Sequence, residues 1–198
     1  MNKERLLQLR LDKKWVFLTK EFNPDDISKL IKYQDCMALA YDLFFDNLND
    51  DTILEFAMRL FFSLKRTYSM EWMMDWKNDV FLGKLCSITW KYEEMYELYK
   101  SAYDRLQDPP DSLLLLLASC HSVPGVPLIT AQEAKEYLQR ALDKKLTYEA
   151  ALMMKSLAMD KQSKEQENYW NKICLELEQN QIHTATIIPD ILSAQNRN

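Results

Sequence analysis

Glycine is almost missing from this 198-residue chain, which holds only Gly83 and Gly125, together with six prolines. All-β folds use glycine and proline in their many turns, and α/β folds use glycine where a strand leads into a helix. The composition therefore predicts an all-α protein. It also excludes the glycine-rich loops that hold phosphates and the tight turn that presents a nucleophilic serine, because those motifs need closely spaced glycines.

Histidine and cysteine are also scarce. The two histidines, His121 and His183, lie far apart, and no residues have the spacing of a known metal-binding helix or loop. Cys120 and His121 are neighbours, but adjacent residues on a helix point in different directions, whereas a nucleophile and its base must share a hydrogen bond. We therefore predict no catalytic residue, no metal and no cofactor, and we interpret Cys120 as a core residue.

Targeting and membrane-spanning segments are not apparent. The N-terminal stretch MNKERLLQLRLDKKW carries charges where a signal peptide has an apolar run, and the longest apolar run, 113–118, is too short to cross a bilayer. The four cysteines stand apart in apolar stretches without a CxxC pair, which is typical of buried thiols in a reducing compartment. We expect a cytoplasmic protein.

Positive charge is limited as well. The chain has 25 Lys and Arg against 30 Asp and Glu, which gives a formal net charge of −5. Nucleic-acid binding needs clustered basic residues, and pairs such as Lys144-Lys145 are short and interrupted by acids. We expect neither nucleic acid nor a membrane as a partner.

Apolar side chains at helical spacing are abundant. The hydrophobic fraction of 47% suffices for a sizeable core. Expected helix caps are Asn23, the run Asn49-Asp50-Asp51, Thr147 and the pair Thr130 and Glu133. The spacing predicts about eight or nine helices packed as stacked antiparallel pairs. They cover residues 3–20, 24–48, 52–66, 69–90, 92–106, 113–120, 131–143, 148–160 and 163–179.

A pattern of small and large residues recurs in two predicted helices. Ala134, Leu138 and Ala141 have the same spacing as Met, Tyr and Ala within residues 95–102. Residues 92–160 thereby resemble the tetratricopeptide (TPR) family of helical repeats, whose small residues at such positions let paired helices approach closely. The resemblance implies a superhelix of helix pairs whose groove accepts a peptide or a protein.

The match to that family is degenerate. The repeat is longer than the family's period of about 34 residues, Leu146 stands where proline is usual, and Met95 replaces a small residue. The next helix continues the pattern with Leu152, Ser156 and Met159.

The resemblance also predicts the domain organisation. We expect one all-helical domain over residues 1–179, in which residues 1–90 form divergent helix pairs and residues 91–160 form TPR-like pairs. Residues 163–179 would then be a capping helix that seals the stack. Residues 180–198 are expected to be a tail, and its apolar IIPDIL stretch must either dock or stay mobile.

Two aromatic clusters are the candidate partner-binding sites. Tyr92, Tyr96 and Tyr103 follow one helix at spacings that place them near one another, and Trp72 and Trp76 share a helix face beside Met73. Tyrosine, tryptophan and methionine are common in protein interfaces, although the same residues also build cores.

The preferred function is a non-catalytic protein–protein interaction domain that binds a peptide or protein partner. The acidic charge, the helical pairs and the missing catalytic signatures favour it. The first alternative is a bacterial toxin-immunity protein or a chaperone-like protein for a secreted substrate. The second alternative is an enzyme of unrecognised class.

Overall fold

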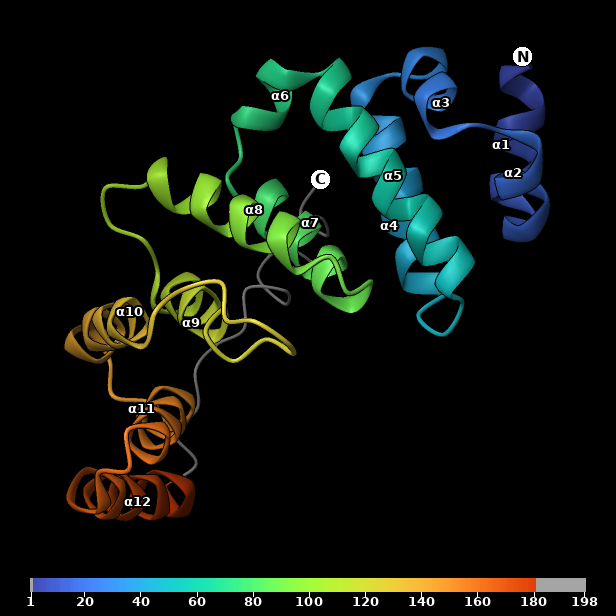
Figure 1. Cartoon of the computed structure of the whole chain (residues 1–198). Coiled ribbons are helices and arrows are strands. Elements are labelled where there is room, and N and C mark those ends of the chain that lie inside the picture. The colour runs from blue at the N-terminus through green and yellow to red at the C-terminus, as the bar shows by residue number, and fades with distance from the viewer. Residues whose placement is uncertain (1, 181–198) are drawn as a thin grey trace. The chain divides into compact units, whose positions relative to one another are not determined.

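The computed structural model describes residues 2–180, which form helices joined by turns and contain no strand (Figure 1). This confirms the all-α class. The helices are α1 (Lys3–Leu11), α2 (Trp15–Glu21), α3 (Pro24–Leu30), α4 (Tyr33–Asp46), α5 (Asp51–Thr67), α6 (Ser69–Met73), α7 (Lys77–Ile88), α8 (Tyr92–Asp104), α9 (Asp111–Ser119), α10 (Ala131–Lys144), α11 (Tyr148–Asp160) and α12 (Lys164–Gln179). None of these helices is long and apolar enough to cross a membrane.

The chain divides into two compact units, one ending at Lys91 and the other beginning at Tyr92. The prediction of a single domain over residues 1–179 stays a prediction. Residues 181–198, which include the IIPDIL stretch and His183, lie outside the described residues, as does Met1.

The predicted count of eight or nine helices is wrong, because residues 2–180 contain twelve. The expected helix 24–48 is interrupted at Ile31, whose backbone is extended with φ −127° and ψ 159°. The carbonyl of Ile31 accepts a 3.1 Å hydrogen bond from the hydroxyl of Tyr68. The expected segment 69–90 breaks before Lys77, whose N–H is bonded to the side chain of Asp75 at 2.9 Å.

The expected helix 3–20 breaks at Lys13, which has a positive φ of 52°. Trp90 and Gln162 have the same left-handed backbone after α7 and α11. Each follows its helix end in a Schellman arrangement. After α11, for example, the N–H of Gln162 bonds the carbonyl of Met159 at 2.9 Å, and the N–H of Ser163 bonds that of Ala158 at 3.0 Å. Glycine usually occupies this position.

The first unit is built around α5. This helix buries residues on most of its sides, and it packs against α2, α3, α4, α6 and α7. Rings from three helices meet at its centre: Tyr41 lies 5.3 Å from Phe61 and 4.7 Å from Phe81, and Phe44 lies 5.2 Å from Phe81. Edge-to-face contacts of this kind each add about 1 kcal/mol beyond burial.

In the second unit, consecutive helices pack on one another from α8 to α12. Ala134, Leu138 and Ala141 form the buried stripe of α10, as expected. The capping box is present, because the Thr130 hydroxyl accepts from the N–H of Glu133 at 3.2 Å while the Glu133 carboxylate accepts from the N–H of Thr130 at 2.8 Å. At the end of the array, α12 buries Cys174 and Leu177 against α11.

Candidate functional site

The five predicted partner-binding residues lie in both units and do not form one site. Trp72 and Trp76 belong to the first unit, and Tyr92, Tyr96 and Tyr103 lie on α8 in the second. Trp76 and the three tyrosines are half-buried, so each presents part of its ring to solvent. Trp72 differs from them.

Trp72 is a core residue, which corrects its prediction as a partner contact. Its side chain is 1% exposed and packs 6.3 Å from the ring of Phe61. The indole Nε1 donates to Asp79 at 2.8 Å. Asp79 also accepts from Nζ of Lys65 at 2.8 Å, so this buried carboxylate links α5, α6 and α7. A burial of this extent leaves Trp72 no surface for a partner.

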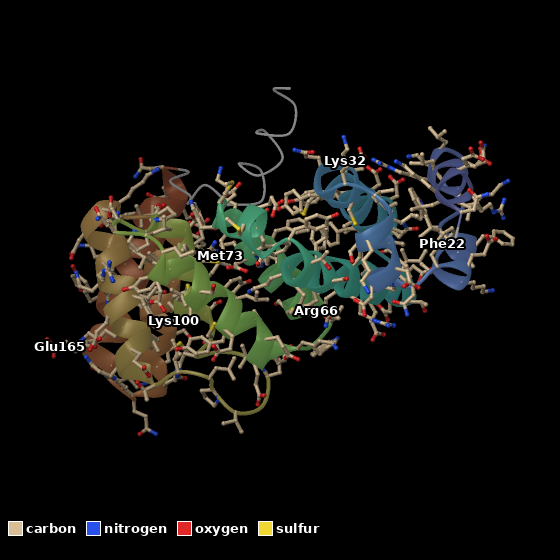
Figure 2. The ribbon with its side chains drawn as sticks, turned by 90° about the horizontal axis from the view of Figure 1, so that it is seen from above. Phe22, Lys32, Arg66, Met73, Lys100 and Glu165 are labelled. Atoms are coloured by element: carbon tan, nitrogen blue, oxygen red, sulfur yellow. The ribbon has the colours of Figure 1, made fainter. Side chains whose placement is uncertain are left out.

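On the second unit, Tyr103 of α8 lies against Tyr137 and Arg140 of α10. The rings of Tyr103 and Tyr137 meet edge to face with 5.5 Å between their centroids. The guanidinium carbon of Arg140 lies 5.3 Å from the Tyr103 centroid, and Arg140 also donates to the Tyr103 hydroxyl. Nζ of Lys100, which Figure 2 labels, lies 5.1 Å from the same centroid. Two cations therefore hold the Tyr103 ring.

Tyr96 belongs to the same cluster. Burial, followed by smaller contributions from Tyr96 and Tyr103, raises the pKa of Tyr137 to about 12. Burial and then the charge of Glu133 raise the pKa of Tyr96. These phenols therefore keep their protons at neutral pH and can donate hydrogen bonds as well as accept them. We call Tyr96, Lys100, Tyr103, Tyr137 and Arg140 the tyrosine surface.

The charges around the tyrosine surface are mostly paired. Lys100 forms an ion pair with Asp104, and Lys144 forms one with Asp108. Arg140 has no ion pair with a carboxylate within residues 2–180, and its side chain is exposed. Sequence reasoning missed Tyr137 and Arg140. Tyr137 falls in the apolar stripe of α10, which gives it an ordinary packing role in the sequence pattern.

A second exposed surface surrounds the buried Trp72. On α6 and directly after it, Met70, Met73 and Met74 are 77%, 64% and 84% exposed. Figure 2 labels Met73. Three largely exposed methionines within five residues are unusual in a part of the chain that also contains a fully buried tryptophan.

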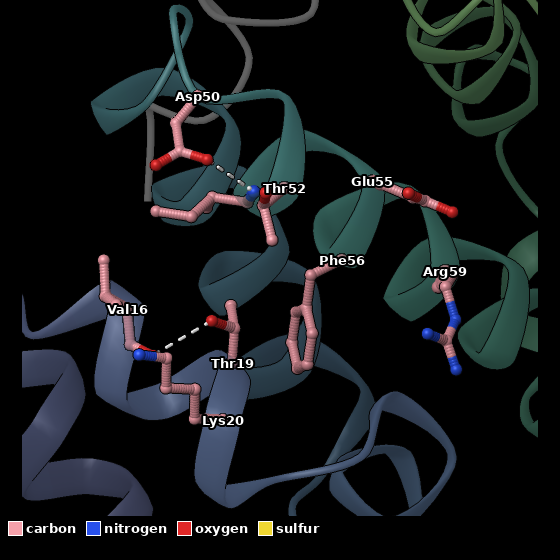
Figure 3. Close-up of a pocket in the computed structure, with 9 residues that line it drawn as sticks. Val16, Thr19, Lys20, Asp50, Thr52, Glu55, Phe56 and Arg59 are labelled. Atoms are coloured by element: carbon pink, nitrogen blue, oxygen red, sulfur yellow. Dashed lines mark hydrogen bonds between the residues drawn. The ribbon is translucent and has the colours of Figure 1, made fainter.

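A cleft of about 410 Å³ lies between α2 and the first turns of α5 (Figure 3). Val16, Thr19 and Lys20 line it from α2, and Phe56 and Arg59 line it from α5. Asp50 and Glu55 lie on its rim as well, but Asp50 is engaged as the cap of α5 through a 3.1 Å bond from the N–H of Ile53. The lining includes charges of both signs, so the net charge of the cleft does not indicate a ligand class.

The neighbouring Cys120 and His121 are held apart by backbone contacts. The Cys120 thiol donates to the carbonyl of Leu116 at 3.4 Å, and burial raises its pKa to about 12. His121 Nδ1 lies 3.1 Å from the carbonyl oxygen of Ile129, and its Nε2 lies 3.8 Å from Asp160. Cys120 is therefore a protonated thiol at neutral pH. Among the residues that the structure describes, no group of three His, Cys, Asp or Glu side chains could hold a metal ion.

Comparisons of the chain with protein-family models, with curated proteins and with solved structures find no match.

Proposed function

We propose that this chain is a non-catalytic interaction protein, and that its tyrosine surface binds a peptide or a segment of a partner protein. The observation that carries the proposal is the contact of Tyr103 on α8 with Tyr137 and Arg140 on α10, and Tyr96 lies seven residues before Tyr103 on the same face of α8. Tyrosine and arginine are among the residues most enriched at binding hot spots, because each combines a large flat contact area with polar atoms.

The geometry of the surface favours binding because the side chains are already held in place. The rings of Tyr103 and Tyr137 meet at nearly right angles, and two cations lie over the Tyr103 ring. Side chains that are ordered before binding lose less conformational entropy in the complex, where each flexible side chain costs about 0.5–1.5 kcal/mol. The capping box of Thr130 and Glu133 also fixes the first turn of the helix that carries Tyr137 and Arg140.

We infer as well that residues 92–160 form TPR-like helix pairs. The burial of Ala134, Leu138 and Ala141 supports this inference, as does the sequential packing of α8 to α11. Leu152, Ser156 and Met159, which continue the pattern in sequence, are exposed on α11. The support for the family therefore comes from α10 more than from α11.

The toxin-immunity and secretion-chaperone hypotheses are narrower forms of the same proposal. The acidic net charge of −5 suits both. No contact within residues 2–180 favours one of them over a general peptide-binding role.

The proposal can be tested with peptides selected from a displayed random library on the immobilised full-length chain. The affinity of a selected peptide would be measured by fluorescence anisotropy for the wild type, for Tyr103→Phe and for Arg140→Gln. Tyr103→Phe keeps the ring but removes the oxygen that accepts from Arg140. We expect each variant to bind about fivefold or more weakly, which corresponds to a loss of about 1 kcal/mol.

Two matched variants serve as controls. Tyr169→Phe changes a tyrosine of α12 that is 60% exposed and in edge contact with Trp170, and Arg59→Gln changes an exposed arginine of the first unit. Both should bind as the wild type does. Equal losses in the controls, or a library that yields no binding peptide, would overturn the proposal.

A further inference from the structure

The exposure of Met70, Met73 and Met74 follows from how α6 is anchored. This helix has only five residues, and its one buried side chain is Trp72. The bond from Trp72 to Asp79 and the bond from Nδ2 of Asn78 to the Trp72 carbonyl, at 3.1 Å, fix the helix on α7. With Trp72 turned inward, the methionines on either side of it turn to solvent.

Exposed methionines are suited to binding apolar partners. The side chain is unbranched and polarisable, so it adapts to different shapes at low cost. A contiguous apolar patch on a protein surface commonly marks an interaction site. The half-buried ring of Trp76 follows directly after the methionines and adds an aromatic group with a polar N–H.

The charged side chains within the methionine segment itself, residues 68–76, are both acidic, and the half-buried Lys77 follows it directly. Residues 68–76 read YSMEWMMDW and contain two acids, Glu71 and Asp75, but no lysine or arginine. Neither acid forms an ion pair within residues 2–180. Both influence Tyr33 at the start of α4, since their charges add to the burial that raises its pKa to about 12. At the start of α4 the exposed Asp35 is offset by the exposed Lys32, so the acidic character of this surface rests on Glu71 and Asp75.

We propose that this methionine surface, Met70, Met73, Met74 and Trp76 with Glu71 and Asp75, binds a basic amphipathic helix of a partner protein. The apolar face of that helix would contact the methionines, and its lysines and arginines would face the two carboxylates. Recognition of an amphipathic helix by an adaptable apolar surface is an established mode of binding. Among amphipathic helices, the carboxylates of Glu71 and Asp75 favour those with basic residues.

This surface shares no residue with the tyrosine surface and lies in the other unit, so the inference goes beyond the proposed function. The two claims can fail separately. Arg140→Gln should weaken binding of a library-selected peptide but leave binding at the methionine surface unchanged.

The test uses three fluorescein-labelled designed helices of about five turns, whose apolar positions are all leucine. The polar positions are lysine in the first peptide, glutamine in the second and glutamate in the third. Anisotropy titrations with the full-length chain should give binding of the Leu/Lys helix that is about tenfold tighter than that of the Leu/Gln helix. The Leu/Glu helix should bind more weakly than both.

Two double variants separate the apolar and the charged contributions. Met70→Ser with Met74→Ser should weaken binding of both the Leu/Lys and the Leu/Gln helices by about fivefold or more. Glu71→Gln with Asp75→Asn should remove the preference for lysine while leaving the Leu/Gln affinity unchanged. The Asp75→Asn change keeps a side-chain oxygen that can accept from the N–H of Lys77, so the fold is kept, and far-UV circular dichroism would verify this.

The matched control is Met159→Ser with Glu136→Gln, which removes an exposed methionine and an exposed acid from the second unit. The inference is overturned if this control weakens binding as much as the surface variants do, or if no helix binds at about 0.1 mM. It is also overturned if the Leu/Gln helix binds as tightly as the Leu/Lys helix. A concentration-dependent dimer that Met70→Ser with Met74→Ser abolishes would identify a second copy as the occupant instead.

Discussion

The indole Nε1 of Trp72 donates a 2.8 Å hydrogen bond to Oδ1 of Asp79, and both side chains are 1% exposed. The same oxygen accepts from Nζ of Lys65 at 2.8 Å. A buried carboxylate is tolerated only where a counter-charge and hydrogen bonds replace its lost water. One oxygen atom thus joins three helices of the first unit and holds α6 in the orientation that exposes the methionine surface.

Asp79→Ala should therefore destabilise the protein strongly. The change leaves the indole N–H of Trp72 without an acceptor and Lys65 without its counter-ion, although Lys65 is 35% exposed and regains some water. We expect the free energy of unfolding to fall by about 3 kcal/mol, as measured by urea denaturation with circular dichroism.

Asp42→Ala is the matched control for that measurement. Asp42 forms an ion pair with Arg10 at 2.7 Å, but its side chain is 44% exposed. An exposed pair of this kind contributes less than about 1 kcal/mol. If the two variants lost the same stability, Asp79 would not have the role assigned to it.

Local signals in the sequence were enough to predict the helix caps. Asn23 and Thr147 accept backbone N–H groups as expected, at 2.9 and 3.4 Å, and within the expected run Asn49-Asp50-Asp51 it is Asp50 that does so, at 3.1 Å. Capping depends on residues within one turn, which are adjacent in the sequence. The signal is therefore complete without any knowledge of the tertiary fold.

The break at Ile31 and the candidate sites depend on contacts between different helices. Ile31 is held extended where its carbonyl meets the hydroxyl of Tyr68. The sequence pattern does not distinguish Trp72 from a surface tryptophan, and its burial follows from its packing on Phe61 of α5 and its bond to Asp79 of α7. The sequence predicted Tyr96 and Tyr103 of the tyrosine surface but not Tyr137, because Tyr137 becomes part of this surface only through the packing of side chains from α8 and α10.

Gln162→Gly should stabilise the protein. Gln162 has φ 55° after the end of α11, a conformation that costs a residue with a Cβ atom about 1–2 kcal/mol. Glycine adopts it without that cost, but glycine also loses about 0.5–1 kcal/mol more backbone entropy on folding. We expect a net gain of about 0.5 kcal/mol in urea denaturation.

Gln139→Gly provides the opposite case within the same unit. Gln139 is exposed in the interior of α10, where glycine lowers helix stability by about 1 kcal/mol. The two substitutions replace the same residue type with glycine, so their difference in sign isolates the backbone conformation. A loss of stability in both variants would contradict the Schellman assignment at Gln162.

The stability of the protein should fall at alkaline pH. Burial raises the pKa of Tyr137 to about 12, above the value of about 10 for an exposed tyrosine. Between these two pKa values the folded protein keeps this proton, whereas the unfolded chain has lost it. The contribution of the protonated Tyr137 to the free energy of unfolding is therefore fully present below pH about 10 and is lost as the pH rises through about 12.

Tyr137→Phe removes that titration and should make the decline shallower in this pH window. Urea midpoints measured between pH about 9 and about 12 would show it. Tyr33→Phe should have the same effect in the first unit, because the pKa of Tyr33 is also raised to about 12 by burial. An unchanged slope in either variant would mean that its hydroxyl is not buried in solution.

The cysteines should resist thiol reagents in the folded protein, since all four are buried. Burial raises the pKa of Cys36 and of Cys120 to about 12, so almost no thiolate, the reactive form, exists near neutral pH.

Cys174 should react first, because it is 6% exposed and lies on α12 at the end of the helical array, whereas the others are fully covered. Alkylation with iodoacetamide at increasing urea, mapped by mass spectrometry, would measure this order, and Cys174→Ser should remove the earliest product. Rapid alkylation of Cys120 without urea would show that its thiol is accessible, and it would revive the pairing with His121 as a nucleophile and its base.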